Sequence, residues 1–387
     1  MSHTLPIAEI FGRENISRLV WPRSDSGTLV REVFLPLLED GVTPYVRNID
    51  GEPFILKIGD KLLPLLVLER QYTNSPIASP YSMYTSFALH ELKTIQNRLL
   101  RAALLLSVGT LIGILQPLLK VCHFNRVVLV NGLPFSTALY PRLSATEIAA
   151  ARTALLARFP KHAIIFRTVD ALAGGEFMQT LREAGCRLIY HRPAYHLHCQ
   201  AQGYKCASAL RRDLALFRKT AYRLVPGEAL DAADIDRIST LYNALFIGKY
   251  GPFNPSYTPR FFQLVARAQS MTILALKKDG RVDGFIGMYE NGEALADPFL
   301  GHDQTLPKSL GLYRMLVALP FLKARELSVP VNFSAGVGLF KRRRGCLLAI
   351  EYLAVLADHL SVAQRLPWRL FELFNRIAVP LMRKVEF

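Results

Sequence analysis

His302, Asp303 and Tyr313 form a group of side chains that could move protons during a group-transfer reaction. A histidine has an unperturbed pKa of about 6.5 and can act as a base near neutral pH. Asp303 could orient that imidazole or hold an ammonium ion, and the Tyr313 hydroxyl could protonate a leaving group. A purely structural interpretation also stands, in which Asp303 caps a turn, His302 is solvated and Tyr313 packs in the core.

A run of four cations provides a candidate site for anionic groups. Lys341 and Arg342 begin it, and two further arginines follow directly in a short predicted helix over residues 339–344. Lysine and arginine side chains bind phosphate oxygens well, so the run could hold a phosphorylated carrier. It could equally form a solvated basic face or contact lipid.

Other catalytic and metal chemistries lack the residues that they need. His196, His198, Cys199 and Cys206 invite a zinc interpretation, but no paired C-x-x-C accompanies them, so we predict no metal site. The chain has no G-x-S-x-G elbow, no dinucleotide-binding fingerprint and no Walker loop. These absences argue against a serine hydrolase, a nicotinamide enzyme and an ATPase.

The length, charge and cysteine content of the chain limit the kinds of protein that it could be. The chain has 387 residues, which suits about two domains, and 51% of them are hydrophobic. Its net charge of +16 predicts an anionic partner, such as anionic lipid, nucleic acid or a phosphate-bearing cofactor. Five cysteines form no even framework, and the first 21 residues show no secretory signal. We therefore expect a cytoplasmic protein.

Two segments point toward a membrane surface. Residues 102–119 carry no charge and are bracketed by Arg101 and Lys120, so they could form a buried core helix, an in-plane helix or a membrane span. Residues 366–384 predict a basic amphipathic helix with Trp368 at its rim. It carries arginines on one face and apolar side chains on another, at positions Arg369, Arg376, Arg383, Leu370, Phe374, Ile377 and Leu381. That helix could instead close the core.

Hydrophobic patterning in the first half alternates strands with helices. We predict strands over residues 44–48, 53–58, 62–68, 126–131, 163–167 and 187–191. Between them, Ser144 and Glu147 form a capping-box pattern that begins a helix ending near Pro160. Alternating strands and helices favour an α/β layer architecture.

The second half has a more regular pattern. After a helix over residues 231–247, an aromatic loop and a short helix from Pro259, three strands cover 271–278, 282–289 and 293–300. Asp279-Gly280 and Asn291-Gly292 are preferred hairpin turns, so these strands predict an antiparallel meander. A helix (309–326), a strand (329–334), the short basic helix and a strand (347–355) complete the order.

This element order resembles that of the GNAT acyltransferase fold. The resemblance implies α/β tandem GNAT-like domains with mixed central sheets flanked by helices, at residues 1–205 and 206–360, followed by the basic helix 361–387. In that fold two strands splay apart around a thioester, and Pro298 would break the pairing here. The usual Q/R-x-x-G-x-G/A loop is absent. Lys308, Ser309 and Gly311 are the nearest counterparts and so the implied cofactor-binding residues.

Dispersed motifs are similar to the FemAB-like and BioF2-like branch of this superfamily, and most of all to bacterial ceramide synthases. They are Gly301-His302-Asp303, Leu312-Tyr313, Phe340-Lys341 with Gly345, and residues 74–81, 130–141 and 159–167. The resemblance implies that Tyr250, Asn254 and Tyr257 wall an acceptor pocket. It also implies that Asn74, Ser79 and Tyr81 belong to a pocket between the domains.

Three functions follow from these expectations. The first is transfer of a fatty acyl group from acyl-CoA or acyl carrier protein to the amine of 3-oxosphinganine or sphinganine, with no permanently bound cofactor and with peripheral contact to the inner membrane. The second is a FemAB-like aminoacyl or acyl transfer to an amino acid, polyamine or cell-wall precursor. The third is non-enzymatic binding to membrane or nucleic acid. The cations are dispersed and form no recognisable nucleic-acid module, which disfavours nucleic acid.

Overall fold

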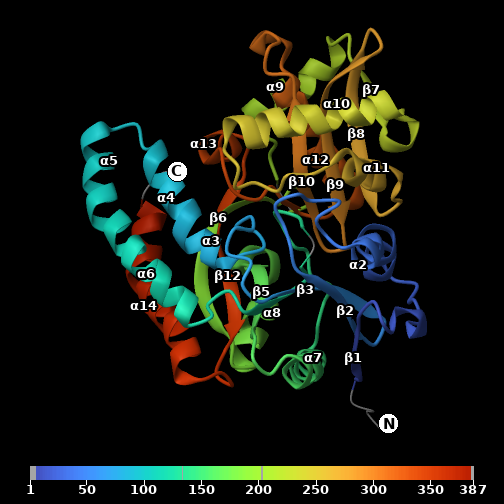
Figure 1. Ribbon diagram of the computed structural model, residues 1–387. Helices are drawn as coiled ribbons and strands as arrows, with labels where there is room; N and C mark the ends of the chain where they lie inside the picture. The colour runs from blue at the N-terminus through green and yellow to red at the C-terminus, as the bar shows by residue number, and fades with distance from the viewer. Residues whose placement is uncertain (1–5, 133, 202–203, 385–387) are drawn as a thin grey trace.

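A single mixed sheet runs through the whole protein. The computed structural model describes residues 6–132, 134–201 and 204–384. Twelve described strands form the sheet in the order β1-β2-β3-β4-β5-β12-β6-β11-β10-β9-β8-β7. Helices cover both faces (Figure 1): α2, α10, α11 and α14 lie on one side, and α7, α8 and α12 lie on the other. The predicted α/β class with a mixed sheet flanked by helices is confirmed.

The first half contributes six strands to this sheet. They are β1 (Ala8–Phe11), β2 (Glu52–Ile58), β3 (Lys61–Leu68), β4 (Val127–Val130), β5 (Ala163–Val169) and β6 (Arg187–Leu197). Its helices are α1 (Asp25–Leu29), α2 (Leu35–Asp40), α3 (Pro80–Ser82), α4 (Ala88–Thr94), α5 (Arg98–Leu104), α6 (Thr110–Val121), α7 (Ala145–Arg158) and α8 (Ala171–Glu183). Ser144 and Glu147 cap α7 reciprocally, as the sequence predicted.

One predicted strand of this half is wrong. Residues 44–48 form turns with a single bridge, Val46 to Tyr257. Pro44 cannot donate to a ladder, and the Asn48 side chain instead donates to the carbonyls of Pro252 and Asn254. The segment therefore braces the 250–257 loop rather than extending the sheet.

The second half contributes the remaining strands. They are β7 (Arg223–Pro226), β8 (Met271–Lys278), β9 (Arg281–Glu290), β10 (Leu295–His302), β11 (Val331–Asn332) and β12 (Leu347–Leu356). Its helices are α9 (Ser208–Leu214), α10 (Ala232–Asn243), α11 (Pro259–Arg267), α12 (Leu312–Leu327), α13 (Gly338–Arg342) and α14 (Val362–Lys384). Gly280 and Gly292 both have positive φ, and the predicted meander β8-β9-β10 is confirmed.

The two halves repeat one topology. In the first, β2, β3 and β4 are antiparallel, and β4 pairs in parallel with β5 after α7. In the second, β8, β9 and β10 are antiparallel, and β10 pairs in parallel with β11 after α12. Each half then adds a helix and a last strand, β6 or β12.

The last strands are exchanged between the halves. β12 pairs antiparallel with β5 of the first half, while β6 pairs antiparallel with β11 of the second. β6 and β12 also pair with each other, which makes the sheet continuous. The predicted boundary near residue 205 falls between β6 and α9, and the sheet is continuous across both halves.

A long apolar helical run lies on the surface. Helices α5 and α6 continue through a π-turn at 105–109 as one helix, Arg98–Val121, with a mean hydropathy of 2.0 in its most apolar 18-residue window. Only 11% of that window is buried. Its length and composition would allow it to cross a membrane, and the buried-core alternative for residues 102–119 is excluded.

The terminal helix α14 presents two apolar faces. Trp368 lies in the core, with its ring centre 4.1 Å from that of Phe124, so its predicted place at the rim is wrong. Asn375, on the same face, bonds β6 through the amide of Tyr190 and the carbonyl of Leu188. Leu370, Phe374, Arg369 and Arg376 are exposed, whereas the side chains of Ile377, Leu381 and Arg383 lie outside the described residues.

We predict that Trp368→Ala destabilises the protein by about 3–5 kcal/mol, because it removes a fully buried indole and leaves a cavity beside Phe124. Phe374→Ala on the exposed face of the same helix is the matched control and should cost less than about 0.5 kcal/mol. Denaturant unfolding measures both. Equal effects would contradict the packing described for α14.

Candidate active site at the splayed strands

Strands β10 and β11 separate after two paired residues. Only Leu295 with Val331 and Ala296 with Asn332 form the parallel ladder. The register of β10 against β9 shifts between Ala296 and Phe299, and this irregular stretch contains Pro298, which has no N–H to donate. The local break predicted at Pro298 is confirmed. The separation frees backbone groups between the strands, as a thioester site requires.

The register shift also sets which way side chains point. Leu295 and Leu300 pack in the core beneath α12, whereas Ala296 and Phe299 pack on the opposite face of the sheet. One extra residue in β10 restores the alternation, so Asp297 and His302 both lie on the α12 face. A regular strand would have placed residues five apart on opposite faces.

Tyr313 completes a cluster on this face. Its ring centre lies 5.7 Å from that of His302 and 5.1 Å from that of Phe340. Burial, and then the charge of Asp297, raise the pKa of the Tyr313 hydroxyl well above its usual value. Burial lowers the pKa of His302, and the nearby Lys249 lowers it further. The structure thus brings together two of the three predicted catalytic residues, His302 and Tyr313, with each other and with Asp297.

Asp297 is the site residue that sequence reasoning missed. It is partly exposed, but its Oδ1 atom is inaccessible to solvent and accepts no hydrogen bond from another residue in the described part of the chain. Burial raises the pKa of its carboxyl group, and the positive charge of Lys341 opposes that shift. One feature of the sequence could have identified it: Asp297 is a lone carboxylate inside an apolar predicted strand, directly before Pro298.

Lys341 lies inside the protein rather than on a basic face. Its Nζ donates to the carbonyls of Phe333 at 2.6 Å, Ser334 at 3.3 Å and Ala335 at 2.7 Å, just after β11. Burial lowers the pKa of this ammonium, and the charge of Asp297 opposes the shift. Lys341 therefore fixes the β11 side of the splay by hydrogen bonds and acts on Asp297 of β10 through its charge.

The other cations of the run have separate positions. Arg344 is buried, bonds Asp213 at 2.6 Å and stacks on Phe340, with its guanidinium carbon 3.2 Å from the ring centre. Arg342 is half-buried and Arg343 is exposed. The four residues do not form one solvated basic face.

The carboxylate of Asp303 is turned toward α10 and β9. It bonds Arg237 at 2.6 Å and Arg281 at 3.3 Å, and it accepts from the Thr305 amide and hydroxyl. Burial alone would raise its pKa, but these hydrogen bonds lower it below its usual value. Asp303 thus caps the turn after β10.

The predicted phosphate-binding residues lie at the start of α12. Lys308 and Ser309 are exposed in a short 3₁₀ turn, and Gly311 has a φ of +72°. The positive φ favours glycine at this position, and an added Cβ would also lie 2.6 Å from a methyl carbon of Leu216. The free N–H groups at the start of the 16-residue helix α12 would favour an anion.

One residue of the predicted acceptor loop lies near Tyr313, and the other two form hydrogen bonds with backbone carbonyls that stabilise the fold. Tyr250 is exposed and lies close enough to Tyr313 for the two hydroxyl groups to interact electrostatically. Tyr257 is fully buried and donates to the Pro134 carbonyl at 2.5 Å. Asn254 donates to the Phe246 carbonyl.

The predicted inter-domain residues Asn74, Ser79 and Tyr81 are buried in a loop that braces the acceptor loop. Asn74 exchanges hydrogen bonds with the backbone of Asp50, and Ser79 bonds the Asn125 side chain at 2.8 Å. Tyr81 packs edge-on against Tyr72. The neighbouring Ser75 donates to the Phe253 carbonyl at 2.6 Å, which connects this loop to residues 250–257.

Residues 134–141 join the first half to the splay. Arg167 of β5 donates to the Phe135 carbonyl, and Arg192 of β6 donates to the Ser136 carbonyl. The Ser136 hydroxyl reaches the Pro298 carbonyl at 3.4 Å. On β12, Glu351 is fully buried and bonds Arg192 at 2.6 Å. A buried charge cluster therefore fixes the segment that lies against the break in β10.

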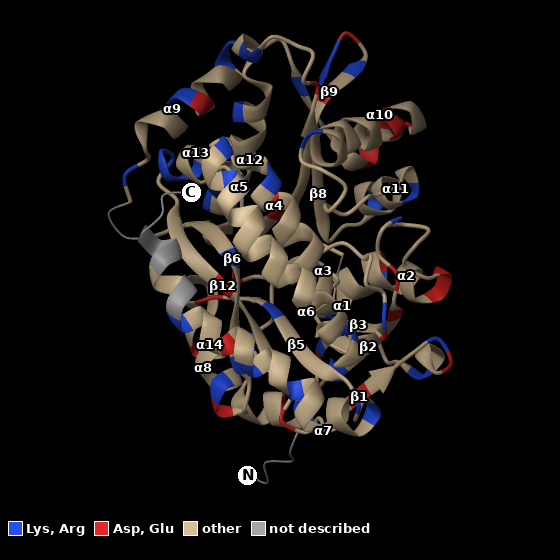
Figure 2. Ribbon diagram, turned by 60° about the vertical axis from the view of Figure 1, so that its left-hand side comes forward, with Lys and Arg blue, Asp and Glu red and all other residues tan. Residues whose placement is uncertain are grey.

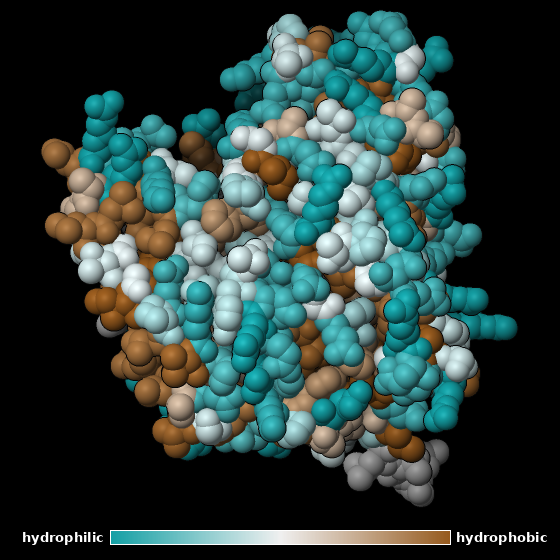
Figure 3. All heavy atoms as spheres, viewed as in Figure 1, coloured by the Kyte–Doolittle hydropathy of each residue, from teal (hydrophilic) through white to brown (hydrophobic). Residues whose placement is uncertain are grey.

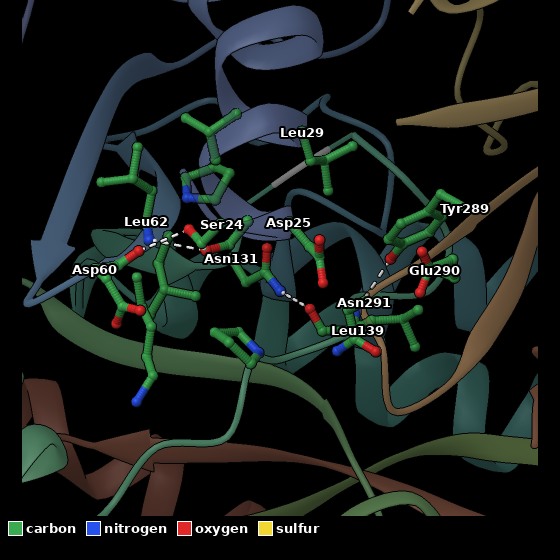
Figure 4. A pocket seen from close by; sticks show the side chains of 16 residues that line it. Ser24, Asp25, Leu29, Asp60, Leu62, Asn131, Leu139, Tyr289, Glu290 and Asn291 are labelled. Atoms are coloured by element: carbon green, nitrogen blue, oxygen red, sulfur yellow. Dashed lines mark hydrogen bonds between the residues drawn. The ribbon is translucent and has the colours of Figure 1, made fainter. Parts of the chain in front are cut away.

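A cavity of about 170 Å³ lies elsewhere, between α1, β3 and the β9-β10 turn (Figure 4). Its walls include Asp25, Asp60 and Glu290, and Asn131 donates to the Leu139 carbonyl beside it. None of the candidate catalytic residues lines this cavity. The candidate catalytic residues therefore lie at the separation of β10 from β11 and not in this cavity.

The zinc candidates form no shared site in the structure. His196 bonds Asp170 at 3.1 Å in the buried sheet, and the Cys199 thiol lies against the Val329 carbonyl. Among the residues that the structure describes, no group of three or more His, Cys, Asp or Glu side chains is placed to hold a metal ion.

Comparisons with known proteins give structural similarity only. No protein-family model and no curated protein matches the chain. FemX matches over 58% of this chain and 78% of its own, at 10% identity and a TM-score of 0.43. L-PGS from Bacillus licheniformis matches over 56% and 74%, at 14% identity and a TM-score of 0.41. A tandem GNAT protein from the clavulanic acid biosynthesis pathway matches over 91% and 100%, at 11% identity and a TM-score of 0.37.

The topology defines the class of protein. Each half contains an antiparallel meander, a helix, a parallel neighbour strand, a second helix and a last strand. The chain is an α/β protein with two topologically equivalent units in tandem, in the element order that the sequence predicted.

We predict that Glu351→Gln destabilises the protein by about 3–5 kcal/mol, because it removes the ion-pair partner of the half-buried Arg192 and a negative charge near the buried Arg167. The matched control is Glu326→Gln, which removes an exposed ion pair with Lys323 and should cost less than about 1 kcal/mol. Unfolding in urea measures both. A stable Glu351→Gln protein would contradict the role assigned to the charge cluster.

Proposed function

We propose that the protein is an N-acyltransferase that moves a fatty acyl group from a thioester donor to the amine of a long-chain base, 3-oxosphinganine or sphinganine, and so forms a ceramide. The observation that carries the proposal is the splay of β10 from β11, with Asp297, His302 and Tyr313 on one face beside the start of α12. The splay could hold the thioester, Asp297 could bind the amine, and His302 and Tyr313 could transfer the protons.

The donor is acyl-CoA or acyl carrier protein. Both carry a phosphorylated arm, which the N–H groups at the start of α12 and the exposed Lys308 and Ser309 could bind. The acyl carbonyl would then lie between β10 and β11, where unpaired backbone N–H groups could polarise it. Lys341 and Arg344 are not available for the donor, because backbone carbonyls and Asp213 occupy them.

The chemistry requires one proton to leave the amine and one to reach the sulfur. The partly exposed Asp297 carboxylate binds the incoming amine, and the neutral His302 imidazole accepts its proton. The amine nitrogen bonds the carbonyl carbon, and the carbon–sulfur bond breaks. Tyr313 protonates the departing thiolate, which gives an amide and a free thiol. Solvent then carries the proton from His302 back to Tyr313.

We predict that purified protein given sphinganine with either donor, palmitoyl-CoA or palmitoyl acyl carrier protein, forms an N-acyl product that mass spectrometry detects. Parallel reactions replace sphinganine with spermidine or free amino acids, and separate reactions supply lysyl-tRNA as donor. Products only with these alternatives would establish the FemAB-like reaction instead. No product from any pairing would reject transferase function in favour of a binding protein.

Two variants separate amine binding from proton transfer. We predict that Asp297→Asn chiefly raises KM for the amine, by about tenfold or more, because it loses a charge-assisted hydrogen bond. His302→Asn should lower kcat by about 100-fold. Burial raises the pKa of Asp297 to about 7 and lowers that of His302, so wild-type activity should fall on acidification first as Asp297 is protonated and again below pH 6.5. His302→Asn should lose only the lower of these two steps.

Asp236→Asn, on an exposed position of α10, is the control for both variants and should leave the kinetic constants unchanged. If Asp297→Asn behaves like this control, the amine does not bind at the splay.

A further inference from the structure

Exposed apolar side chains are concentrated on two helices. In the described part of the chain, 23 large hydrophobic residues are exposed. Eight lie on the helical run Arg98–Val121 and five lie on α14, which leaves ten for the rest of the molecule. Figure 3 shows this gathering as brown surface along the left edge, where Figure 1 places α5, α6 and α14. We refer to it as the two-helix apolar surface.

The two helices are parts of one surface. Phe124 lies three residues after the end of α6, and its ring centre lies 4.1 Å from that of Trp368 and 5.4 Å from that of Phe371, both on α14. Tyr84 also packs on Phe371, at 4.4 Å. These buried rings hold the helices together from beneath, so their exposed faces are fixed relative to each other.

Charges around this surface are almost all positive. Residues 102–119 carry no charge, and Arg98, Arg101 and Lys120 bracket them (Figure 2). On α14, Arg369 and Arg376 are exposed, while the acidic Glu372 bonds Arg187 at 2.7 Å. An apolar face with a cationic edge is complementary to an anionic bilayer, whose acyl chains and headgroups match both parts.

The two hydroxyl groups within the apolar run are satisfied internally. The Ser107 hydroxyl donates to the Ala103 carbonyl at 2.8 Å, and the Thr110 hydroxyl donates to the Leu106 carbonyl at 2.5 Å. A helix in hydrocarbon needs such internal partners, because no water is present to replace them.

The same run is fixed along one side, which excludes a simple span. Ile112 and Leu119 are buried, and Leu89 of α4 lies against Gly109. Asn97 caps the run at one end and β4 follows soon after the other. Both ends therefore return to the same protein body, and the helix would have to detach from α4 to cross a bilayer.

We propose that the two-helix apolar surface docks the protein on an anionic lipid bilayer, with the run Arg98–Val121 and α14 lying in the plane of the membrane. The proposal goes beyond the proposed function and does not depend on it, because lipid binding requires no acyl transfer. If the acceptor is a lipid amine, docking gives the enzyme access to it at the surface where it resides.

Vesicle flotation of the full-length protein tests the proposal. Wild-type protein should float with vesicles of phosphatidylglycerol and phosphatidylethanolamine, and at least about tenfold less with phosphatidylcholine vesicles. Leu106→Glu with Ile114→Glu places two charges on the apolar run at exposed positions, and should lower binding by at least about tenfold. Val20→Glu with Leu224→Glu, at exposed apolar positions elsewhere, is the matched control and should bind like wild type.

Several outcomes would overturn the proposal. Equal binding to both vesicle types would show that charge complementarity does not drive binding. Unchanged binding by the Leu106/Ile114 variant would show that another part of the protein contacts the lipid. A wild-type dimer in sedimentation velocity that the same variant dissociates, without vesicle binding by either protein, would make a second copy the occupant. Retention in membranes through alkaline carbonate extraction would show a span. Circular dichroism confirms that each variant is folded.

Discussion

A buried cluster of charges on adjacent strands holds the two halves in a fixed relation. Glu351 on β12 bonds Arg192 on β6, while Arg192 and Arg167 on β5 donate to the backbone of residues 135 and 136. Burial and the neighbouring arginine lower the pKa of Arg167 to about 10, which still leaves it charged at neutral pH. Because a buried charge without a partner is costly, this cluster tolerates few alternative arrangements.

The geometry of the candidate site depends on that cluster through a short chain of contacts. The anchored segment places Ser136 against the Pro298 carbonyl, and Tyr289 of β9 donates to the Thr137 carbonyl in the same segment. The irregular stretch of β10 is thus supported from the side opposite α12. Its extra residue turns Asp297 toward the same face as His302, and Lys341 fixes the facing strand end. Precise placement of reacting groups depends on such supporting contacts.

Local features could be predicted from the sequence, and pairings between distant segments could not. The hairpins at Gly280 and Gly292, the Ser144 cap and the break at Pro298 depend on neighbouring residues, and all were predicted. Hydrophobic periodicity identifies a strand without naming its partner, so the exchange of β6 and β12 left no signal. The electrostatic interaction between Asp297 and Lys341 was missed for the same reason. Trp368 was misplaced because α14 has two apolar faces, and the pattern does not say which one is covered.

The exchanged last strands have a consequence for synthesis of the protein. Strand β5 ends at residue 169, but its antiparallel partner β12 begins at residue 347, so the edge of β5 stays open while most of the second half is made. The first half therefore cannot finish folding as an independent unit when it leaves the ribosome. Closing so distant a pair late favours slow folding and exposes a sheet edge that could join with another chain. Truncation before residue 347 should consequently destabilise both halves, because β12 pairs with β5 and β6 of the first half and belongs to the second.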